Sequence, residues 1–194
     1  MTDAAPLTQI HPPVTPQLVG QSAVKPFGRT ELLDHLAAKG MKTTTVEHPA
    51  VHTVAESSVI DINVPGAHTK NLFLKDEDGR LLLVVAKSST KVDLKLIAKA
   101  LGTARLSFGK PELMMAVLGV TPGSVTAFAI INDVKRQVRV IMDNELMAHD
   151  SVNCHPLENT ATTNIALDDL LRFIRETGHE PEGLTVGTPS SLET

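Results

Sequence analysis

Residues 69–86 constrain the fold of this chain more than any other stretch. Two apolar runs, 71–75 and 80–86, flank a polar break that ends in glycine, Asp76-Glu77-Asp78-Gly79. An Asp-Gly pair between apolar runs predicts a β-hairpin, because glycine supplies the positive φ angle that a tight turn needs. The second run is apolar from Leu81 to Ala86, so both faces of this strand should be covered. The pattern predicts a central hairpin with two polar residues at its open end, Lys70 and Asn71.

Apolar residues at helical or alternating spacing predict the other elements. We expect helices between a capping residue or proline and a terminal glycine, at 30–40, 90–102, 111–119 and 167–178. A helical turn is expected at 144–147, and residues 52–63 are ambiguous. Short strands are expected at 43–46, 105–108, 125–131, 138–142, 151–155 and 160–163, with 125–131 and 138–142 forming a second hairpin. The mixture predicts an α+β fold, with a curled, mostly antiparallel mixed sheet that is barrel-like and flanked by helices.

The ends of the chain differ in composition from its middle. Five prolines in residues 1–26 predict a disordered or extended leader, and residues 180–194 are rich enough in Pro, Gly, Ser and Thr to predict a loose tail. Residues 27–179 are then one folded domain, which suits a chain of 194 residues. No apolar run is long enough to span a membrane, and the N-terminus lacks a secretory signal. We therefore expect a soluble, cytoplasmic protein.

Charge is distributed unevenly along the chain. The net charge is −4, yet residues 70–110 hold nine basic and four acidic side chains, a local charge of +5 that leaves −9 for the rest. Lys91, Lys95 and Lys99 recur every four residues, so they would form one stripe on the predicted helix. The stripe is either a weak binding surface for a polyanion such as tRNA or an ordinary solvated helix face. Recognition of RNA by aromatic stacking is disfavoured, because the chain has no Trp, no Tyr and only 5 Phe.

Several residues that could carry chemistry have simpler interpretations. His48 and His52 have the spacing of a helical metal site, but Pro49 between them argues against a helix. Cys154, the single cysteine, is interpreted as a small buried side chain rather than a nucleophile, because its neighbour His155 would point to the opposite face of a strand. Ser124 lacks the second glycine of a nucleophile elbow.

Two further residues keep open alternatives. His155 precedes Pro156 in a polar loop, where it is either a surface histidine or part of a site. Lys70 is either functional or a strand-edge lysine that discourages sheet association. No glycine-rich phosphate loop or dinucleotide fingerprint is present.

Three motifs in this order resemble one known family: Thr69-Lys70-Asn71-Leu72-Phe73-Leu74, Gly119-Val120-Thr121-Pro122-Gly123-Ser124-Val125-Thr126 and His155-Pro156-Leu157-Glu158-Asn159-Thr160. The family is YbaK/ProX, the free-standing trans-editing aminoacyl-tRNA deacylases related to the editing domain of bacterial prolyl-tRNA synthetases. Within it the chain looks most like the alanyl-tRNA(Pro) deacylase branch, also called PrdX or ProXp-ala. The resemblance covers about residues 30–179. One departure is Ala127, where many relatives carry proline.

The resemblance implies a set of site residues. The functional lysine and its neighbouring amide fall on Lys70 and Asn71, and the histidine falls on His155. The glycine–proline loop supplies Gly119 and Gly123 to the catalytic set. Substrate-binding positions are implied at Lys75, Pro122, Ser124 and Val125.

The resemblance also implies the reaction. It is hydrolysis of the ester that joins alanine to the terminal ribose of proline tRNA, with no cofactor and no metal. Such an ester is already activated, so positioning of water and stabilisation of the oxyanion would suffice. A synthetase pocket for proline excludes the smaller alanine poorly, which makes a second, smaller site useful.

The alternatives are the same chemistry on a tRNA mischarged with cysteine or serine, and a non-catalytic module that binds tRNA or a synthetase. The expected partner is the acceptor end of a mischarged tRNA. Prolyl-tRNA synthetase and an elongation factor are further candidate partners, whereas DNA and membranes are not.

Overall fold

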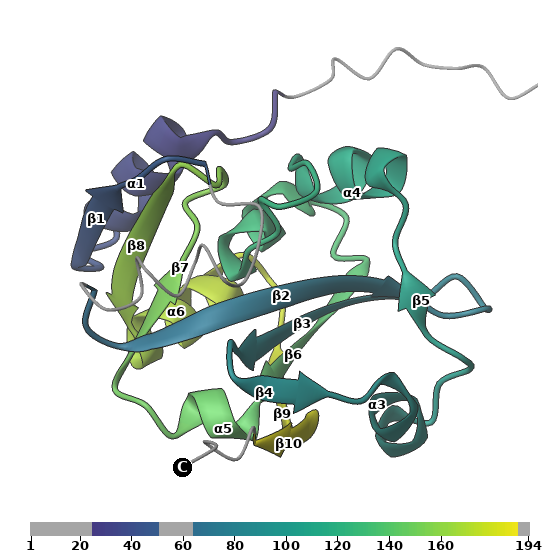
Figure 1. Cartoon of the computed structure of the whole chain (residues 1–194). Helices are drawn as coiled ribbons and strands as arrows, with labels where there is room; N and C mark the ends of the chain where they lie inside the picture. The colour runs from purple at the N-terminus through teal and green to yellow at the C-terminus, as the bar shows by residue number, and fades with distance from the viewer. Residues whose placement is uncertain (1–24, 51–63, 190–194) are drawn as a thin grey trace, which may run out of the picture.

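The computed structural model describes residues 25–50 and 64–189. Its centre is an eight-stranded mixed sheet (Figure 1). Seven strands follow one another across the sheet in the order β1 (Thr43–Glu47), β8 (Ala161–Ala166), β7 (Ser151–Cys154), β2 (Ala67–Lys75), β3 (Leu81–Lys87), β6 (Val138–Asp143) and β9 (Pro181–Leu184). The eighth, β5 (Ser107–Phe108), also pairs with β2. A separate two-stranded sheet joins β4 (Thr90–Val92) to β10 (Gly187–Pro189).

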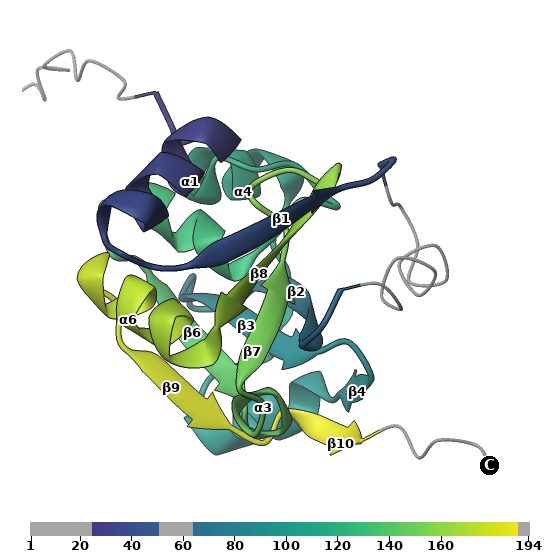
Figure 2. The same ribbon diagram turned by 90° about the vertical axis from the view of Figure 1, so that its left-hand side faces the viewer.

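Helices cover both faces of the central sheet (Figures 1 and 2). The helical elements are α1 (Arg29–Ala38), α3 (Leu94–Leu101), α4 (Pro111–Leu118), the 3-10 helix η1 (Ala127–Asn132), α5 (Asn144–Met147) and α6 (Leu167–Glu176). Buried residues of α1, α4, η1, α5 and α6 form a large core on one face, which we call the first core. On the other face α3 packs over a smaller second core that also includes Leu106 and Val186. The mixed sheet with flanking helices confirms the predicted fold class.

The predicted central hairpin is present. β2 and β3 pair antiparallel from Thr69 opposite Lys87 to Lys75 opposite Leu81, and Gly79 takes a φ of 89° in the turn. Side chains of β3 alternate between the two cores: Leu81, Leu83 and Val85 lie in the first, and Leu82, Val84 and Ala86 in the second. All six side chains are buried, which confirms the prediction that both faces of this strand are covered.

The second predicted hairpin is wrong. Residues 127–132 form η1, and Thr126 caps it by accepting a hydrogen bond from the Phe128 backbone N–H at 3.4 Å. The next strand, β6, pairs parallel with β3 instead of antiparallel with its neighbour in sequence. The error has a simple cause, because a short run that is buried on every side has no periodicity with which to tell a strand from a helix. Residues 127–130 are all fully buried.

Several boundaries also differ from the predictions. Residues 90–92 form β4, and α3 begins only after Asp93, whose carboxylate accepts from Lys95 N at 2.8 Å and Leu96 N at 3.2 Å. Helix α1 begins at Arg29 with Gly28 as its N-cap, rather than at Thr30. Residues 181–189, expected in a loose tail, supply β9 and β10.

The sheet is open rather than barrel-like, since β1 and β9 lie at opposite ends of the strand order. Residues 1–24, which include most of the predicted leader, lie outside the described residues, as do the ambiguous segment 51–63 with His52 and the end of the tail. None of the described helices is long and apolar enough to cross a membrane.

Candidate active site

Strand alternation separates Lys70 from Asn71. Lys70 lies opposite Ala86, so its side chain is on the face of the second core, whereas Asn71 lies opposite Val85 on the face of the first core. The two residues that the sequence predicts as one unit at the mouth of the hairpin therefore serve different sides of the sheet.

The Lys70 ammonium is half-buried and has a backbone partner. Its Nζ donates a hydrogen bond to the carbonyl oxygen of Thr90, the first residue of β4. Burial lowers the pKa of Lys70 below its usual value, and the neighbouring Asp143 carboxylate opposes this by raising it. Asp143 is fully buried at the end of β6 and accepts a hydrogen bond of 2.6 Å from the Thr90 hydroxyl. Lys70 is therefore a cation held in a defined place, unlike a strand-edge lysine in solvent.

On the first-core face, Asn71 belongs to a small polar group beside Cys154. The Asn71 amide lies 3.4 Å from the Thr69 hydroxyl, which donates to the Asn153 carbonyl at 2.8 Å and lies 3.7 Å from Cys154 Sγ. Asn71 Oδ1 is buried and accepts no hydrogen bond from the described residues. Burial raises the pKa of the Cys154 thiol to about 12, against the opposing hydrogen bond from Thr69. This agrees with the interpretation of Cys154 as a buried side chain.

The pairing of β2 with β7 sets which side of the sheet Lys70 faces. These strands run parallel, with Ala67 level with Val152 and His68 level with Asn153. The side chains of His68 and Asn153 meet at 3.0 Å, and strand alternation puts Lys70 on the same face as His68. Lys70 and His155 each come two residues after this paired stretch, and His155 is the first residue after β7. Lys70 thus shares the face that carries His68 and Asn153, whereas Asn71 lies on the other.

A second histidine lies beside His155. The ring centroids of His48 and His155 are 6.1 Å apart, and His48 Nε2 is 2.9 Å from the Thr162 hydroxyl. His155 is half-buried, and the next two residues, Pro156 and Leu157, are buried. The loop 155–160 is therefore less exposed than its polar composition suggests.

Arg29 ties the loop 155–160 to two other parts of the fold. Its guanidinium donates to Glu158 Oε1 at 3.0 Å and also to the Glu47 carboxylate, and Thr160 Oγ1 donates to the same Glu158 oxygen at 2.9 Å. These contacts join the start of α1, the end of β1 and the loop after His155. Arg29 is thus placed to hold the loop in one conformation.

The glycine–proline segment forms the predicted turn. Ser124 N donates to the Thr121 carbonyl at 3.0 Å, and Gly123, with a φ of 89°, takes the position that requires glycine. Gly119 ends α4 with a φ of 66°, and a Cβ there would lie 2.8 Å from Asn132 Nδ2. A Cβ on Gly123 would lie 3.6 Å from Asn159 Nδ2, so the turn adjoins the loop that follows His155. Pro122 is exposed, Ser124 is buried, and Val125 is half-buried against the first core.

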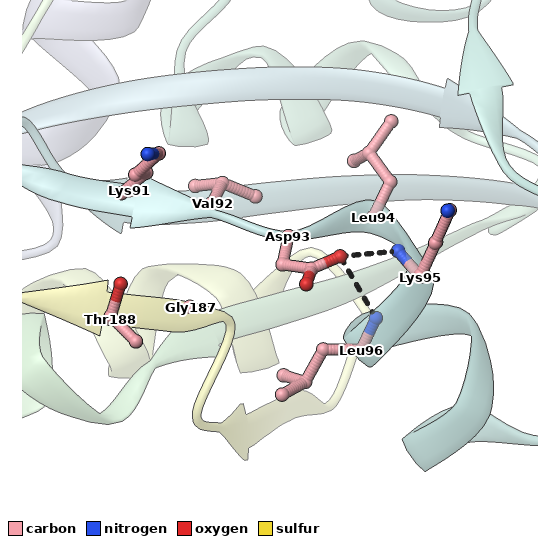
Figure 3. Close-up of a pocket in the computed structure, with 8 residues that line it drawn as sticks. All are labelled: Lys91, Val92, Asp93, Leu94, Lys95, Leu96, Gly187 and Thr188. Carbon is pink, nitrogen blue, oxygen red and sulfur yellow. Dashed lines mark hydrogen bonds between the residues drawn. The ribbon is translucent and has the colours of Figure 1, made fainter.

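The remaining predicted lysines are spread over three elements. Lys75 is exposed at the far end of β2, five residues from Lys70 and therefore roughly 17 Å away along the strand. Lys91 lies on β4, whereas Lys95 and Lys99 lie on α3, so the predicted single helical stripe is wrong. Lys91 and Lys95 do share a groove of about 570 Å³ between β4, α3 and β10 (Figure 3). Asp93 in this groove is turned onto the N–H groups of α3 (Figure 3).

In the part of the chain that the structure describes, no cluster of three or more His, Cys, Asp or Glu side chains has a geometry that could hold a metal ion.

Comparison with known proteins identifies the family. The model of the aminoacyl-tRNA editing domain matches residues 48–173. The chain belongs to this family. The match includes all three motifs and confirms the resemblance to the YbaK/ProX deacylases, enzymes that hydrolyse the aminoacyl-tRNA ester.

Relatives of this editing-domain protein carry related names. It is 38% identical over 165 residues to "Prolyl-tRNA synthetase associated domain-containing protein 1" of Danio rerio, and the aligned residues cover 84% of this chain and 90% of the relative. It is 36% identical over 137 residues to "Prolyl-tRNA editing protein ProX" of Acetoanaerobium sticklandii, which covers 70% of this chain and 84% of the relative. A crystal structure described as a candidate trans-editing enzyme for prolyl-tRNA synthetase matches its fold with a TM-score of 0.62 at 20% identity, covering 80% of this chain and 96% of that one.

Four residues around the candidate site were not predicted to belong to it: Arg29, His48, Thr90 and Asp143. In the sequence, the spacing of His48 from His52 suggests only a metal ligand, and the place of Thr90 at the start of an expected helix suggests only a cap. Asp143 lies 73 residues from Lys70 in the chain, and Arg29 lies 129 residues from Glu158, so no local pattern joins these pairs. An aspartate directly after the apolar run 138–142 was the one sequence signal for Asp143.

Proposed function

We propose that this editing-domain protein removes alanine from mischarged tRNA(Pro) by hydrolysing the aminoacyl ester. One observation carries the proposal. In a chain of the aminoacyl-tRNA editing family, the half-buried Lys70 and His155 each come two residues after the paired stretch of β2 and β7, and the loop after His155 adjoins the Gly123 turn. The names of the relatives, one of which refers to prolyl-tRNA synthetase and the other to prolyl-tRNA editing, favour proline tRNA over other tRNAs.

The roles follow from the chemistry of each group. Lys70 is a point charge suited to the terminal phosphate or ribose oxygen of the tRNA. The backbone of the turn from Gly119 to Gly123 offers groups that bind the α-ammonium or orient water. His155 supports the amino-acid pocket, and the 2′-hydroxyl of the substrate shares the proton transfer. Asn71 acts from the opposite face, through Thr69 and the strand that carries Lys70.

Selectivity for alanine is steric in this proposal. The wall that excludes proline consists of the Gly119–Gly123 turn and residues 125–131, of which 127–131 belong to η1, with His155 on one side. Residues 127–130 are fully buried and back this wall from the core, so it is rigid and overlap with a larger amino acid is costly. Lys75, Pro122, Ser124 and Val125 are assigned to substrate binding on family resemblance.

Other partners follow from the substrate. The acceptor end of the tRNA is the primary partner, and prolyl-tRNA synthetase or an elongation factor would deliver it in the cytoplasm, where translation takes place. Lys91 and Lys95 are assigned to phosphate contacts along the tRNA, with Lys99 further out on α3.

The test compares hydrolysis of Ala-, Ser-, Cys- and Pro-charged tRNA(Pro) by the wild-type protein and by Lys70→Ala. We expect rapid release of alanine, little release of proline, and loss of most activity in the folded variant. Preference for cysteine or serine would select the alternative substrates. Binding of tRNA without release of any amino acid would select the non-catalytic module. Rapid cleavage of Pro-tRNA(Pro) would end the editing proposal, since such an enzyme would destroy the correct product.

A further inference from the structure

Asp143 is a buried carboxylate with no cationic partner in direct contact among the described residues. It has no exposed surface, at the point where β6 ends and α5 begins. Oδ2 accepts from the Thr90 hydroxyl at 2.6 Å and from Lys87 N at 3.3 Å, and Oδ1 accepts from Glu145 N at 3.3 Å. All of these donors are neutral, so no opposite charge compensates the free energy that the carboxylate loses when it leaves water. Burying it therefore destabilises the fold, which suggests a role beyond packing.

Thr90 is bonded on both sides. Its hydroxyl donates to Asp143, and its backbone carbonyl accepts from the Lys70 ammonium. Thr90 is itself only 1% exposed, so this link is shielded from water. It joins three elements, β2, β4 and β6, at one point of the sheet.

We propose that Asp143 and Thr90 are positioning residues for Lys70, with Thr90 as the link between the buried carboxylate and the ammonium. The inference rests on the proposed function in one respect, that Lys70 touches the tRNA end. Thr90 fixes where the ammonium points, and the negative charge of Asp143 keeps a half-buried lysine protonated. Both effects present a ready charge to the substrate without reorganisation.

The other charged groups near Lys70 do not supply this effect. The elements around it carry His68 on β2, Lys87 on β3, Lys91 on β4 and Glu145 on α5, and His155 follows β7. Lys87 lies opposite Thr69 and so belongs to the other face of the sheet, and Glu145 is exposed. Among the described residues, Asp143 is the charged group that acts on the pKa of Lys70, so its carboxylate is the stabilising group.

The experiment measures the pKa of Lys70 directly and the pH profile of deacylation in parallel. Wild-type protein, Asp143→Asn and Thr90→Val carry ¹³C-methylated lysines, and the Lys70 signal, assigned by its loss in Lys70→Ala, is titrated by NMR. Without the charge of Asp143 the pKa of Lys70 should fall, because only that carboxylate opposes the effect of burial. The basic limb of kcat/KM should move to lower pH by the shift that the titration measures.

Thr90→Val removes the hydroxyl with little change of shape and should lower kcat/KM about tenfold, the value of one hydrogen bond to a charged group. Thr90→Ser restores the hydroxyl and should recover most of this loss.

The matched control is Asp133→Asn. Asp133 is a second buried carboxylate, 2% exposed, at the other end of β6, where it accepts from Val138 N at 2.8 Å. This variant should lose stability but leave the Lys70 titration and the pH profile unchanged.

An unchanged Lys70 pKa in folded Asp143→Asn, or equal shifts in both aspartate variants, would overturn the inference and leave Asp143 as a cap of α5. Failure of the proposed function is a separate outcome. In that case the wild type releases no amino acid while the NMR titration still decides the role of Asp143.

Discussion

The burial of Cys154 leads to a prediction about mechanism. Cys154 precedes His155 and lies in the candidate site region, so a thiol nucleophile is the obvious competing mechanism. Its side chain is 1% exposed, and burial raises the pKa of the thiol to about 12. At pH 7.5 the thiolate fraction is then roughly 3 in 100,000, against about one tenth for an ordinary cysteine of pKa near 8.5. The reactive form is depleted on the order of a thousandfold.

Cys154→Ala should therefore keep the deacylation rate within about twofold. Loss of one buried sulfur should cost about 1 kcal/mol of unfolding free energy, because the change is close to deletion of a buried methyl group. For a domain of this size, that corresponds to a melting temperature lower by roughly 2–4 °C.

Two assays check this reasoning. Deacylation is measured for wild type and Cys154→Ala with the same mischarged tRNA, at a temperature where both are folded. A chromogenic disulfide reagent is then added to native and to unfolded wild-type protein. Since the chain has a single cysteine, unfolded protein should react with one equivalent at once, while native protein should react at least about a thousandfold more slowly. A folded Cys154→Ala variant that has lost activity a hundredfold, or native protein that labels as fast as unfolded protein, would refute the argument.

Three further predictions concern Arg29, His179 and the groove lysines. Arg29→Ala should lower kcat/KM, because the loop 155–160 loses the guanidinium that holds Glu158. The control is Arg139→Ala, which breaks a similar partly exposed ion pair with Glu182. Both variants should lose about 1 kcal/mol or less of unfolding free energy, but Arg139→Ala should keep full activity per folded molecule. His179→Ala should destabilise by about 3 kcal/mol, seen in denaturant unfolding, because it leaves buried Asp133 without the partner 3.2 Å away. Burial would raise the pKa of Asp133, but the hydrogen bonds from His179 and Val138 N lower it overall. The stability that the pair contributes is therefore present above about pH 4 and is lost as pH falls through the folded-state pKa of Asp133. A difference in unfolding free energy between wild type and His179→Ala that persists unchanged in acid would contradict this. Replacing both Lys91 and Lys95 with Ala should reduce the salt slope of tRNA binding by up to about one unit per contact without altering amino-acid choice, and Lys135→Ala, an exposed lysine elsewhere, should leave the slope unchanged.

The local elements were largely predictable because their causes are local. The Asp-Gly turn, the apolar strand β3 and the helix ends at Gly102 and Gly119 depend on backbone angles and on residue type within a few positions. The family was likewise visible in three short motifs, and the editing-domain match covers all of them. Errors arose where a local signal was shared by two structures. Residues 127–130 are apolar in a row and fully buried, a pattern that suits a 3-10 helix as well as a strand.

The sequence by itself determined the hairpin, the buried cysteine and the set of candidate site residues. Only the tertiary structure decided which side chains lie together. Lys70 and Asn71 are neighbours in the chain but lie on opposite faces of the sheet. Lys70 bonds to Thr90, Thr90 bonds to Asp143, and the rings of His48 and His155 lie side by side, all but the first across long separations in sequence. The physical reason is register. Each pairing depends on how strands far apart in sequence align, and a shift of one residue would turn every side chain of a strand to the other face.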